Sequence, residues 1–322
     1  MARTAVIGAG LIGRSWAIVF ARAGHDVALW DPAPEAADAA RAFAADRLPD
    51  LAQAGLLGGA APETVLARIA VAASLADAVA AADWVQENGP ERLETKSALF
   101  ADLDRLAPAA AILASSTSTI PASKFGGTIP GRRRILVAHP VNPPYLIPVV
   151  EIAPATWTDP EIVAQARAFM AASGMVPAVL RREIDGFVLN RLQAALLAEA
   201  FRLAEDGVAS IEDIDATIRD GLGLRWALMG PFETIDLNAP GGLADYCARY
   251  GQALGGLIAQ MTPRDWSEGL VARLDADRRV ALPATDLAAR TAWRDSRLMA
   301  LLAHKAGLRP DPPKGARPLE TR

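Results

Sequence analysis

Short apolar runs alternate with stretches of helical periodicity along the first half of the chain. Each run is rich in Val, Ile, Leu and Ala and is bounded by Gly, Pro, Asn or Asp, which is typical of buried strands. The helical stretches between them return each strand in the same direction, so the pattern predicts a doubly wound, mostly parallel α/β sheet. About eight strands are expected, at residues 4–7, 26–31, 69–72, 84–86, 111–114, 135–138, 149–152 and 176–180.

Near residues 181–186 this alternation ends, and only helical periodicity follows. The sequence therefore predicts a Rossmann-type domain at 1–184 and an all-helical C-terminal domain at 185–322. Residues 309–322 form a Pro-rich tail that we expect to be mobile. Other expected helices include 33–54, broken at Pro49, then 62–68, 160–173, 187–206, one capped by Ser210, and one that begins near Gly221.

A glycine-rich turn joins the first expected strand to the first helix. Its sequence fits G-x-G-x-x-G, and the next strand ends in an acidic residue. The glycines allow the backbone to approach a pyrophosphate, the helix N-terminus favours its charge, and the carboxylate can bind the ribose hydroxyls. That carboxylate would repel a 2′-phosphate, so NAD rather than NADP is expected. We expect the cofactor to be bound by Gly8, Gly10, Leu11, Ile12, Gly13 and Asp31.

A proline-rich segment at 135–152 carries the best candidate for acid–base chemistry. Its first apolar run delivers His139 and then Asn142 into a loop stiffened by prolines, and its second run contains Glu151. If the two runs pair, the carboxylate can orient the imidazole and support its positive charge, as a general base requires. The alternative is a packed histidine and a surface glutamate.

Two further loops follow expected parallel strands, at the edge where α/β sheets bind ligands. One contains Glu91 and leads to Lys96. These two residues either take part in ligand binding at this edge or form an exposed pair without a role. The other is a hydroxyl cluster at 115–119, which either caps a turn or places a hydroxyl beside the nicotinamide.

Composition narrows the class of protein. The 322 residues are 52% apolar and 22% charged, which is typical of a globular chain with two domains, and the net charge of −4 indicates no nucleic-acid partner. Cys247 is the only cysteine, so an internal disulfide and a cysteine metal cage are excluded. We find no signal peptide or membrane span, expect no metal, and place the chain in the cytoplasm.

Several separated motifs resemble the 3-hydroxyacyl-CoA dehydrogenase superfamily, and most closely its L-gulonate 3-dehydrogenase branch, which includes lambda-crystallin. The resemblance covers nearly the whole chain. It is carried by GLIGRSW at 10–16, AHPVNPPY at 138–145, GFVLNRLQ at 186–193, DGLGLR at 220–225, and GPFET at 230–234 with LN at 237–238.

This resemblance implies roles for individual residues. His139 would be the catalytic base and Glu151 its orienting partner, while Ser118 and Asn190 would bind the reacting oxygen. Asn142 would brace the loop after the histidine, and the cofactor site would also include it and Ser118. Glu91 and Lys96 would approach the nicotinamide side of NAD. The helical domain would contribute to the substrate cleft and build a homodimer.

The substrate is expected to be a small 3-hydroxy acid, oxidised with transfer of hydride to NAD. Residues 33–75, where the superfamily places basic contacts to CoA, contain no lysine and only three arginines. Arg225 stands where CoA-specific relatives lack a basic residue, so it would either clamp a substrate carboxylate or form a structural salt bridge.

L-Gulonate fits this description best. L-Carnitine is the alternative, because carnitine dehydrogenases look similar around Arg225 and Trp226 could meet a quaternary ammonium, unless it is a core or interface residue. A 3-hydroxyacyl-CoA is a third substrate, and a non-catalytic NAD-binding or structural protein is a rival of another class.

Overall fold

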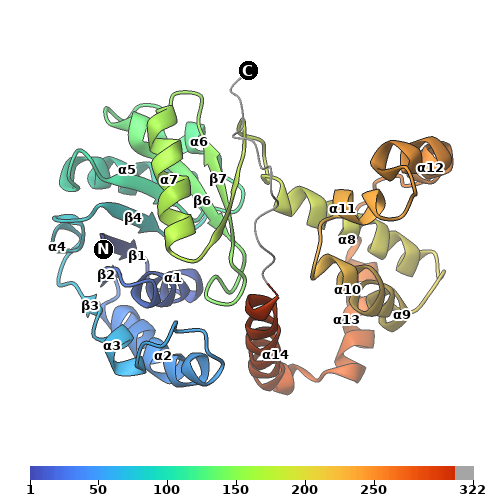
Figure 1. Ribbon diagram of the computed structural model, residues 1–322, viewed down its shortest axis with the longest axis horizontal. Helices are drawn as coiled ribbons and strands as arrows, with labels where there is room; N and C mark the ends of the chain where they lie inside the picture. The colour runs from blue at the N-terminus through green and yellow to red at the C-terminus, as the bar shows by residue number, and fades with distance from the viewer. Residues whose placement is uncertain (309–322) are drawn as a thin grey trace. The chain divides into compact units, whose positions relative to one another are not determined.

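The computed structural model describes residues 1–308, so the predicted mobile tail at 309–322 lies outside the described residues (Figure 1). The chain forms two compact units. The sheet unit contains residues 1–191 and the described residues from Arg294 onward, and the helical unit contains residues 192–293. The two divisions fall inside α8 (Leu189–Glu205) and α14 (Leu287–Gly307). The sequence-based domain bounds of 1–184 and 185–322 stay a prediction.

One eight-stranded sheet forms the centre of the sheet unit (Figure 1). Its order is β3-β2-β1-β4-β5-β6-β7-β8, with parallel pairing throughout except for β7, which is antiparallel to β6. The predicted fold class, a doubly wound and mostly parallel sheet followed by helices, is confirmed. The strands are β1 (Arg3–Ile7), β2 (Asp26–Trp30), β3 (Ile69–Val71), β4 (Trp84–Glu87), β5 (Ile112–Ser115), β6 (Ile135–Pro140), β7 (Val149–Pro154) and β8 (Val176–Val179).

Each face of the sheet has its own apolar core, because successive side chains of a strand point to opposite faces. In β1, Val6 joins one core, and Ala5 and Ile7 join the other. The first core is covered by α1 (Leu11–Arg22), α2 (Pro34–Gln53), α3 (Pro62–Leu66) and α7 (Pro160–Ala172). The second is covered by α4 (Leu75–Val79), α5 (Leu93–Leu106) and α6 (Ala122–Gly126), and a 3-10 turn, η1 (Arg132–Arg134), precedes β6.

The helix α2 does not break at Pro49, so that prediction is wrong. Pro49 lies in the last part of the helix and is exposed, so water can satisfy the carbonyl that its missing N–H leaves free. Leu48 and Leu51 on either side of it are buried in the core and hold the last turn in place.

Two helices expected in the helical unit are found there. Ser210 caps α9 by accepting a hydrogen bond from the N–H of Asp213 at 3.1 Å, as predicted. The helix expected to begin near Gly221 is α10, which begins at Gly223, and a π-helical segment joins it to α9 without a break. The elements of this part of the chain are α9 (Ile211–Ala216), η2 (Thr217–Leu222), α10 (Gly223–Trp226), α11 (Pro231–Asp236), α12 (Gly242–Ile258), α13 (Glu268–Ala281) and η3 (Ala284–Asp286).

A bilayer-spanning helix is absent from residues 1–308, since none of their helices combines the required length with sufficient apolar character.

Candidate active site

The turn after β1 has a shape that requires glycine. Gly8 adopts φ +90°, and its N–H donates to the carbonyl of Trp30 at 2.8 Å. A Cβ on Gly13 would lie 1.8 Å from the carbonyl oxygen of Gly8, so α1 packs directly against the end of β1. A Cβ on Gly10 would meet no protein atom within 4 Å, so the turn is open on the side of the α1 N-terminus. This is the form that binds a dinucleotide pyrophosphate.

Asp31 follows β2 and faces this turn. One carboxylate oxygen accepts from the N–H of Ala9 at 2.7 Å, and the other accepts from the N–H of Ala33 at 2.9 Å. These bonds fix the half-buried carboxylate beside the glycine turn, while each oxygen keeps a further lone pair. Both ribose hydroxyls of a dinucleotide can therefore be accepted here, and the residues present fit NAD.

A buried ion pair lies under the loop that follows β4. Nζ of Lys96 lies 3.0 Å from both carboxylate oxygens of Glu87, and both side chains are fully buried. Glu87 also accepts from the hydroxyl of Ser115 at 2.5 Å and from the N–H of Gly89 at 2.6 Å. Lys96 is therefore not part of an exposed pair. Lys96 holds the loop from its buried side, and its Nζ lies 3.7 Å from Oε2 of Glu91.

Glu91 joins this loop to the hydroxyl cluster. Its Oε1 accepts from the hydroxyls of Thr117 and Thr119 at 2.6 and 3.0 Å, and from the backbone N–H groups of Ser118 and Thr119 at 3.0 Å. Burial acts to raise the pKa of Glu91, but these hydrogen bonds and Lys96 outweigh it and hold the pKa below its usual value. An ionised Glu91 thus organises the loop.

The hydroxyl cluster serves more than one purpose. Thr117 closes the turn by accepting from the N–H of Ile120 at 2.9 Å, as a cap does. Ser118 is exposed, and its carbonyl accepts from the amide of Asn190 at 2.8 Å. The structure therefore brings Ser118 and Asn190 together from segments that are 72 residues apart in the chain.

His139 and Glu151 form a buried pair in the sheet. They are direct partners in the register of β6 and β7, and Nδ1 of His139 lies 2.9 Å from Oε2 of Glu151. The other oxygen, Oε1, accepts from the N–H groups of Val188 and Leu189 at 2.8 and 2.9 Å. Burial acts to raise the Glu151 pKa, but the bonds from His139 and the two amides lower it below its usual value. Glu151 is therefore a buried carboxylate and not a surface residue.

The remaining predicted residues are less constrained. Asn142 is exposed, and its side chain forms no hydrogen bond within residues 1–308. Arg225 lies on α10 in the helical unit and is also exposed. No acidic residue of the described chain forms an ion pair with Arg225, so the structural salt bridge considered above is not found there.

Sequence reasoning missed Glu87 and Phe187. Glu87 had a usable signal, because it is the last residue of β4 and precedes a loop at the ligand-binding edge. Phe187 had none, because its conformation, with φ +50°, is unusual for a bulky residue. Its ring is fully buried against the imidazole of His139, with 5.4 Å between ring centroids.

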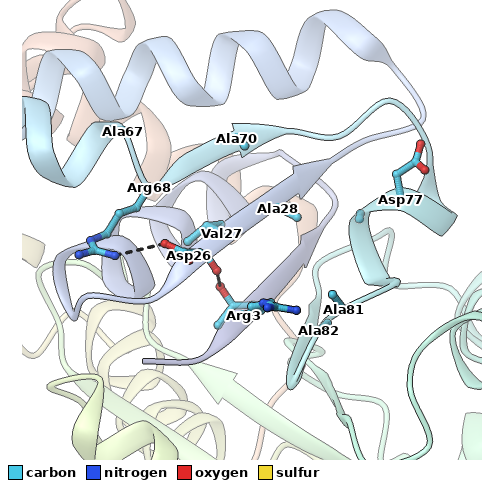
Figure 2. Close-up of a pocket in the computed structure, with 12 residues that line it drawn as sticks. Arg3, Asp26, Val27, Ala28, Ala67, Arg68, Ala70, Asp77, Ala81 and Ala82 are labelled. Carbon is cyan, nitrogen blue, oxygen red and sulfur yellow. Dashed lines mark hydrogen bonds and ion pairs between the residues drawn. The ribbon is translucent and has the colours of Figure 1, made fainter.

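A separate pocket of about 300 Å³ lies at the opposite edge of the sheet (Figure 2). Arg3 and Asp26 are the first residues of β1 and β2, whereas the glycine turn and Asp31 follow the ends of these strands. Figure 2 shows Arg68 directed toward Asp26, and their ion pair measures 3.2 Å. Most other lining residues are alanines, and this pocket is not part of the candidate site.

Comparison with known proteins gives the family. Residues 3–184 match the NAD binding domain of 3-hydroxyacyl-CoA dehydrogenase, and residues 186–279 match its C-terminal domain. A lambda-crystallin homolog from Bos taurus is 44% identical over 92% of this chain and 94% of its own length. L-Carnitine dehydrogenase from Streptomyces griseus is 43% identical over 78% of this chain and 74% of its own length.

A solved structure agrees over most of the chain. The 5-formyl-3-hydroxy-2-methylpyridine 4-carboxylic acid 5-dehydrogenase, described as an NAD+ dependent dismutase, superimposes with a TM-score of 0.83 at 29% identity, covering 95% of this chain and 99% of that one. The predicted cofactor and the predicted class of enzyme are thereby confirmed. The chain belongs to the 3-hydroxyacyl-CoA dehydrogenase family and is an NAD-dependent dehydrogenase.

Proposed function

We propose that this dehydrogenase oxidises the 3-hydroxyl group of a small hydroxy acid, with His139 as general base. The pairing of His139 with Glu151 carries the proposal. Because Nδ1 donates to the carboxylate, Nε2 is the ring nitrogen available to take the hydroxyl proton. The ionised carboxylate then stabilises the imidazolium that forms. A positioned base of this kind contributes about 10²–10⁴-fold to the rate.

Ser118 and Asn190 are proposed to stabilise the oxygen that becomes a carbonyl. One N–H of the Asn190 amide donates to the carbonyl of Ser118, which leaves the second N–H free for the substrate. The hydroxyl of Ser118, which is exposed, would be a second donor. Two preorganised donors lower the free energy of the transition state as charge develops on that oxygen.

The geometry of the loops at this edge of the sheet supports an assignment of the cofactor residues. We propose that Gly8, Gly10, Leu11, Ile12, Gly13 and Asp31 hold the adenosine and pyrophosphate half of NAD, and that Glu91, Lys96, Ser118 and Asn142 are on the nicotinamide side. NAD, when bound, supplies the hydride acceptor. Lys96 is buried on Glu87, so it would act on the cofactor through the position of the loop.

L-Gulonate, oxidised to 3-dehydro-L-gulonate, is the substrate we propose. The three arginines of residues 33–75 are all engaged within the chain: Arg41 donates to the carbonyl of Ile69 at 3.0 Å, Arg47 pairs with Asp50 at 3.6 Å, and Arg68 pairs with Asp26. Little basic character remains there for the nucleotide of a CoA ester. Arg225 has no ion-pair partner within residues 1–308, which supports a role as clamp for a substrate carboxylate.

L-Carnitine is a second candidate for two reasons. L-Carnitine dehydrogenase from Streptomyces griseus is 43% identical to this chain, and Trp226, next to Arg225, is partly exposed. An exposed indole can bind a quaternary ammonium by cation–π contact.

We also propose that the protein acts in the cytoplasm. We propose further that it forms a homodimer through the helical unit. Tyr250, Leu254, Leu257 and Ile258 are spaced to share one face of α12, and all are exposed. A second copy would cover this apolar face. Light scattering on the purified protein should give twice the mass of one chain, and Leu254→Arg should give the monomer.

The substrate is tested by following NADH formation with L-gulonate, L-carnitine and L-3-hydroxybutyryl-CoA, each with NAD and with NADP. We expect turnover of L-gulonate with NAD, and a rise of about tenfold or more in its KM in Arg225→Met, since a bidentate charged contact is lost. Turnover of L-carnitine alone would give the second candidate. Turnover of the CoA ester alone would overturn the small-acid proposal.

A further inference from the structure

Phe187 lies where the sheet meets the start of α8, and no role in the reaction described above depends on it. Its ring is fully buried and packs on the imidazole of His139 at 5.4 Å between centroids, with 42° between the ring planes. A buried phenyl ring packed at this distance leaves the imidazole less space in which to rotate.

The backbone of Phe187 is also unusual. It has φ +50° directly after Gly186 with φ +72°, and its N–H closes the turn on the carbonyl of Ile184 at 3.0 Å. Glycine adopts this left-handed conformation readily, but a side chain with a Cβ does so at a cost in free energy. Such a conformation persists when the surroundings fix it, and it is frequent at functional sites.

The turn at Phe187 also places hydrogen-bond donors on Glu151. It directs the N–H groups of Val188, just before α8, and of Leu189, the first residue of α8, at Oε1 of Glu151, with distances of 2.8 and 2.9 Å. A helix N-terminus leaves these amides without partners inside the helix, so the carboxylate is well bound there. Oε2 remains for His139. The side chain of Phe187 thus contacts His139, and the turn at Phe187 presents the next two amides of the chain to Glu151.

We propose that Phe187 is a positioning residue that holds both members of the His139–Glu151 pair in register. It touches neither substrate nor cofactor in this account, and acts through the imidazole and the carboxylate. The proposal rests on the proposed role of His139, but its geometric part does not depend on the identity of the substrate.

The test compares Phe187→Leu with Phe100→Leu. Phe100 is equally buried, and its ring packs on Phe125, away from the pair, so it reports the general effect of losing a buried aromatic ring. The chain has only three histidines, so selective ¹⁵N labelling of histidine gives three rings, with His25 and His304 as internal references. Phe187→Met is the second variant if Phe187→Leu does not fold.

We expect both variants to lose similar amounts of thermal stability. Only Phe187→Leu should lower kcat by about tenfold or more, as expected for a misplaced base, with KM for NAD within about twofold of wild type. Its His139 ring resonances should shift and its Nδ1–H should exchange faster with water, while those of His25 and His304 stay in place.

The proposal is overturned if the His139 resonances and exchange match wild type in Phe187→Leu, or if Phe100→Leu changes them equally. Absence of turnover of every substrate by the wild-type protein would instead contradict the proposed function, and the spectra would still decide the role of Phe187.

Discussion

His139 and Glu151 are paired across the antiparallel strands β6 and β7, with 2.9 Å between Nδ1 and Oε2. This is the one antiparallel junction of the sheet, where the chain reverses through the proline-rich loop and brings the carboxylate back beside the ring. Because Oε1 is bound to the amides of Val188 and Leu189, the carboxylate cannot rotate away from the imidazole without losing two further bonds.

Replacing Glu151 by glutamine tests this pairing. The neutral amide retains the shape but cannot support an imidazolium, so kcat should fall by about 10²-fold or more while NAD affinity changes little. Steady-state kinetics and NAD titration by fluorescence measure the two effects. His139→Ala should abolish turnover and also leave NAD affinity nearly unchanged; joint loss of turnover and NAD affinity in that variant would contradict its role as base.

The second and third glycines of the nucleotide turn, Gly10 and Gly13, should respond differently to alanine. A Cβ on Gly13 would lie 1.8 Å from a backbone oxygen, so Gly13→Ala should lower the free energy of unfolding by about 3 kcal/mol. A Cβ on Gly10 meets no protein atom within 4 Å, so Gly10→Ala should leave the melting temperature unchanged. It should nevertheless raise the Kd for NAD about tenfold or more, because the backbone can no longer approach the pyrophosphate. Unchanged NAD affinity in Gly10→Ala would argue against this binding mode.

Breaking the buried Glu87–Lys96 pair should be costly. Lys96→Met leaves a fully buried carboxylate without its cation, so urea denaturation should show a loss of about 3–5 kcal/mol. Adding Glu87→Gln to that variant should restore part of the loss. The exposed pair Arg105–Asp102 is the matched control, and Arg105→Met should cost less than about 1 kcal/mol. Equal losses in the two single variants would show that burial does not govern this pair.

Stability should depend on pH through His25. Burial, the chain N-terminus and Arg68 lower its pKa, and Asp26 offsets them only in part. The unfolded chain therefore takes up the proton first, so the contribution of His25 to stability is complete above about pH 6.5 and is lost as the pH falls below it.

The geometry around His25 agrees with a neutral ring. Its Nδ1 accepts from the N–H of Ala2 at 3.1 Å, which a protonated nitrogen could not do. Urea denaturation at pH 8 and pH 5.5 should show a larger loss for wild type than for His25→Gln, which does not titrate. The same loss in both proteins would assign the pH dependence to other groups.

Local patterns along the chain were sufficient to predict most of the fold. Strands and helices alternate because apolar periodicity reflects which faces are buried, and this is encoded residue by residue. The glycine turn and Asp31 were also predictable, since the motif and the strand that precedes it are contiguous in the sequence. Pro49 was misjudged because its cost depends on whether water can reach one carbonyl, and that depends on which face of α2 is exposed.

The details of the site required the tertiary structure. Sequence analysis placed His139 and Glu151 on neighbouring runs, but only the register of β6 and β7 makes them direct partners. Burial of Lys96 on Glu87 and the contact of Phe187 with His139 depend on elements brought together by folding. The physical reason is that secondary structure is set largely by neighbours in the chain. Side-chain distances, desolvation and the pKa of Glu151 are set by residues that are remote in sequence and adjacent in space.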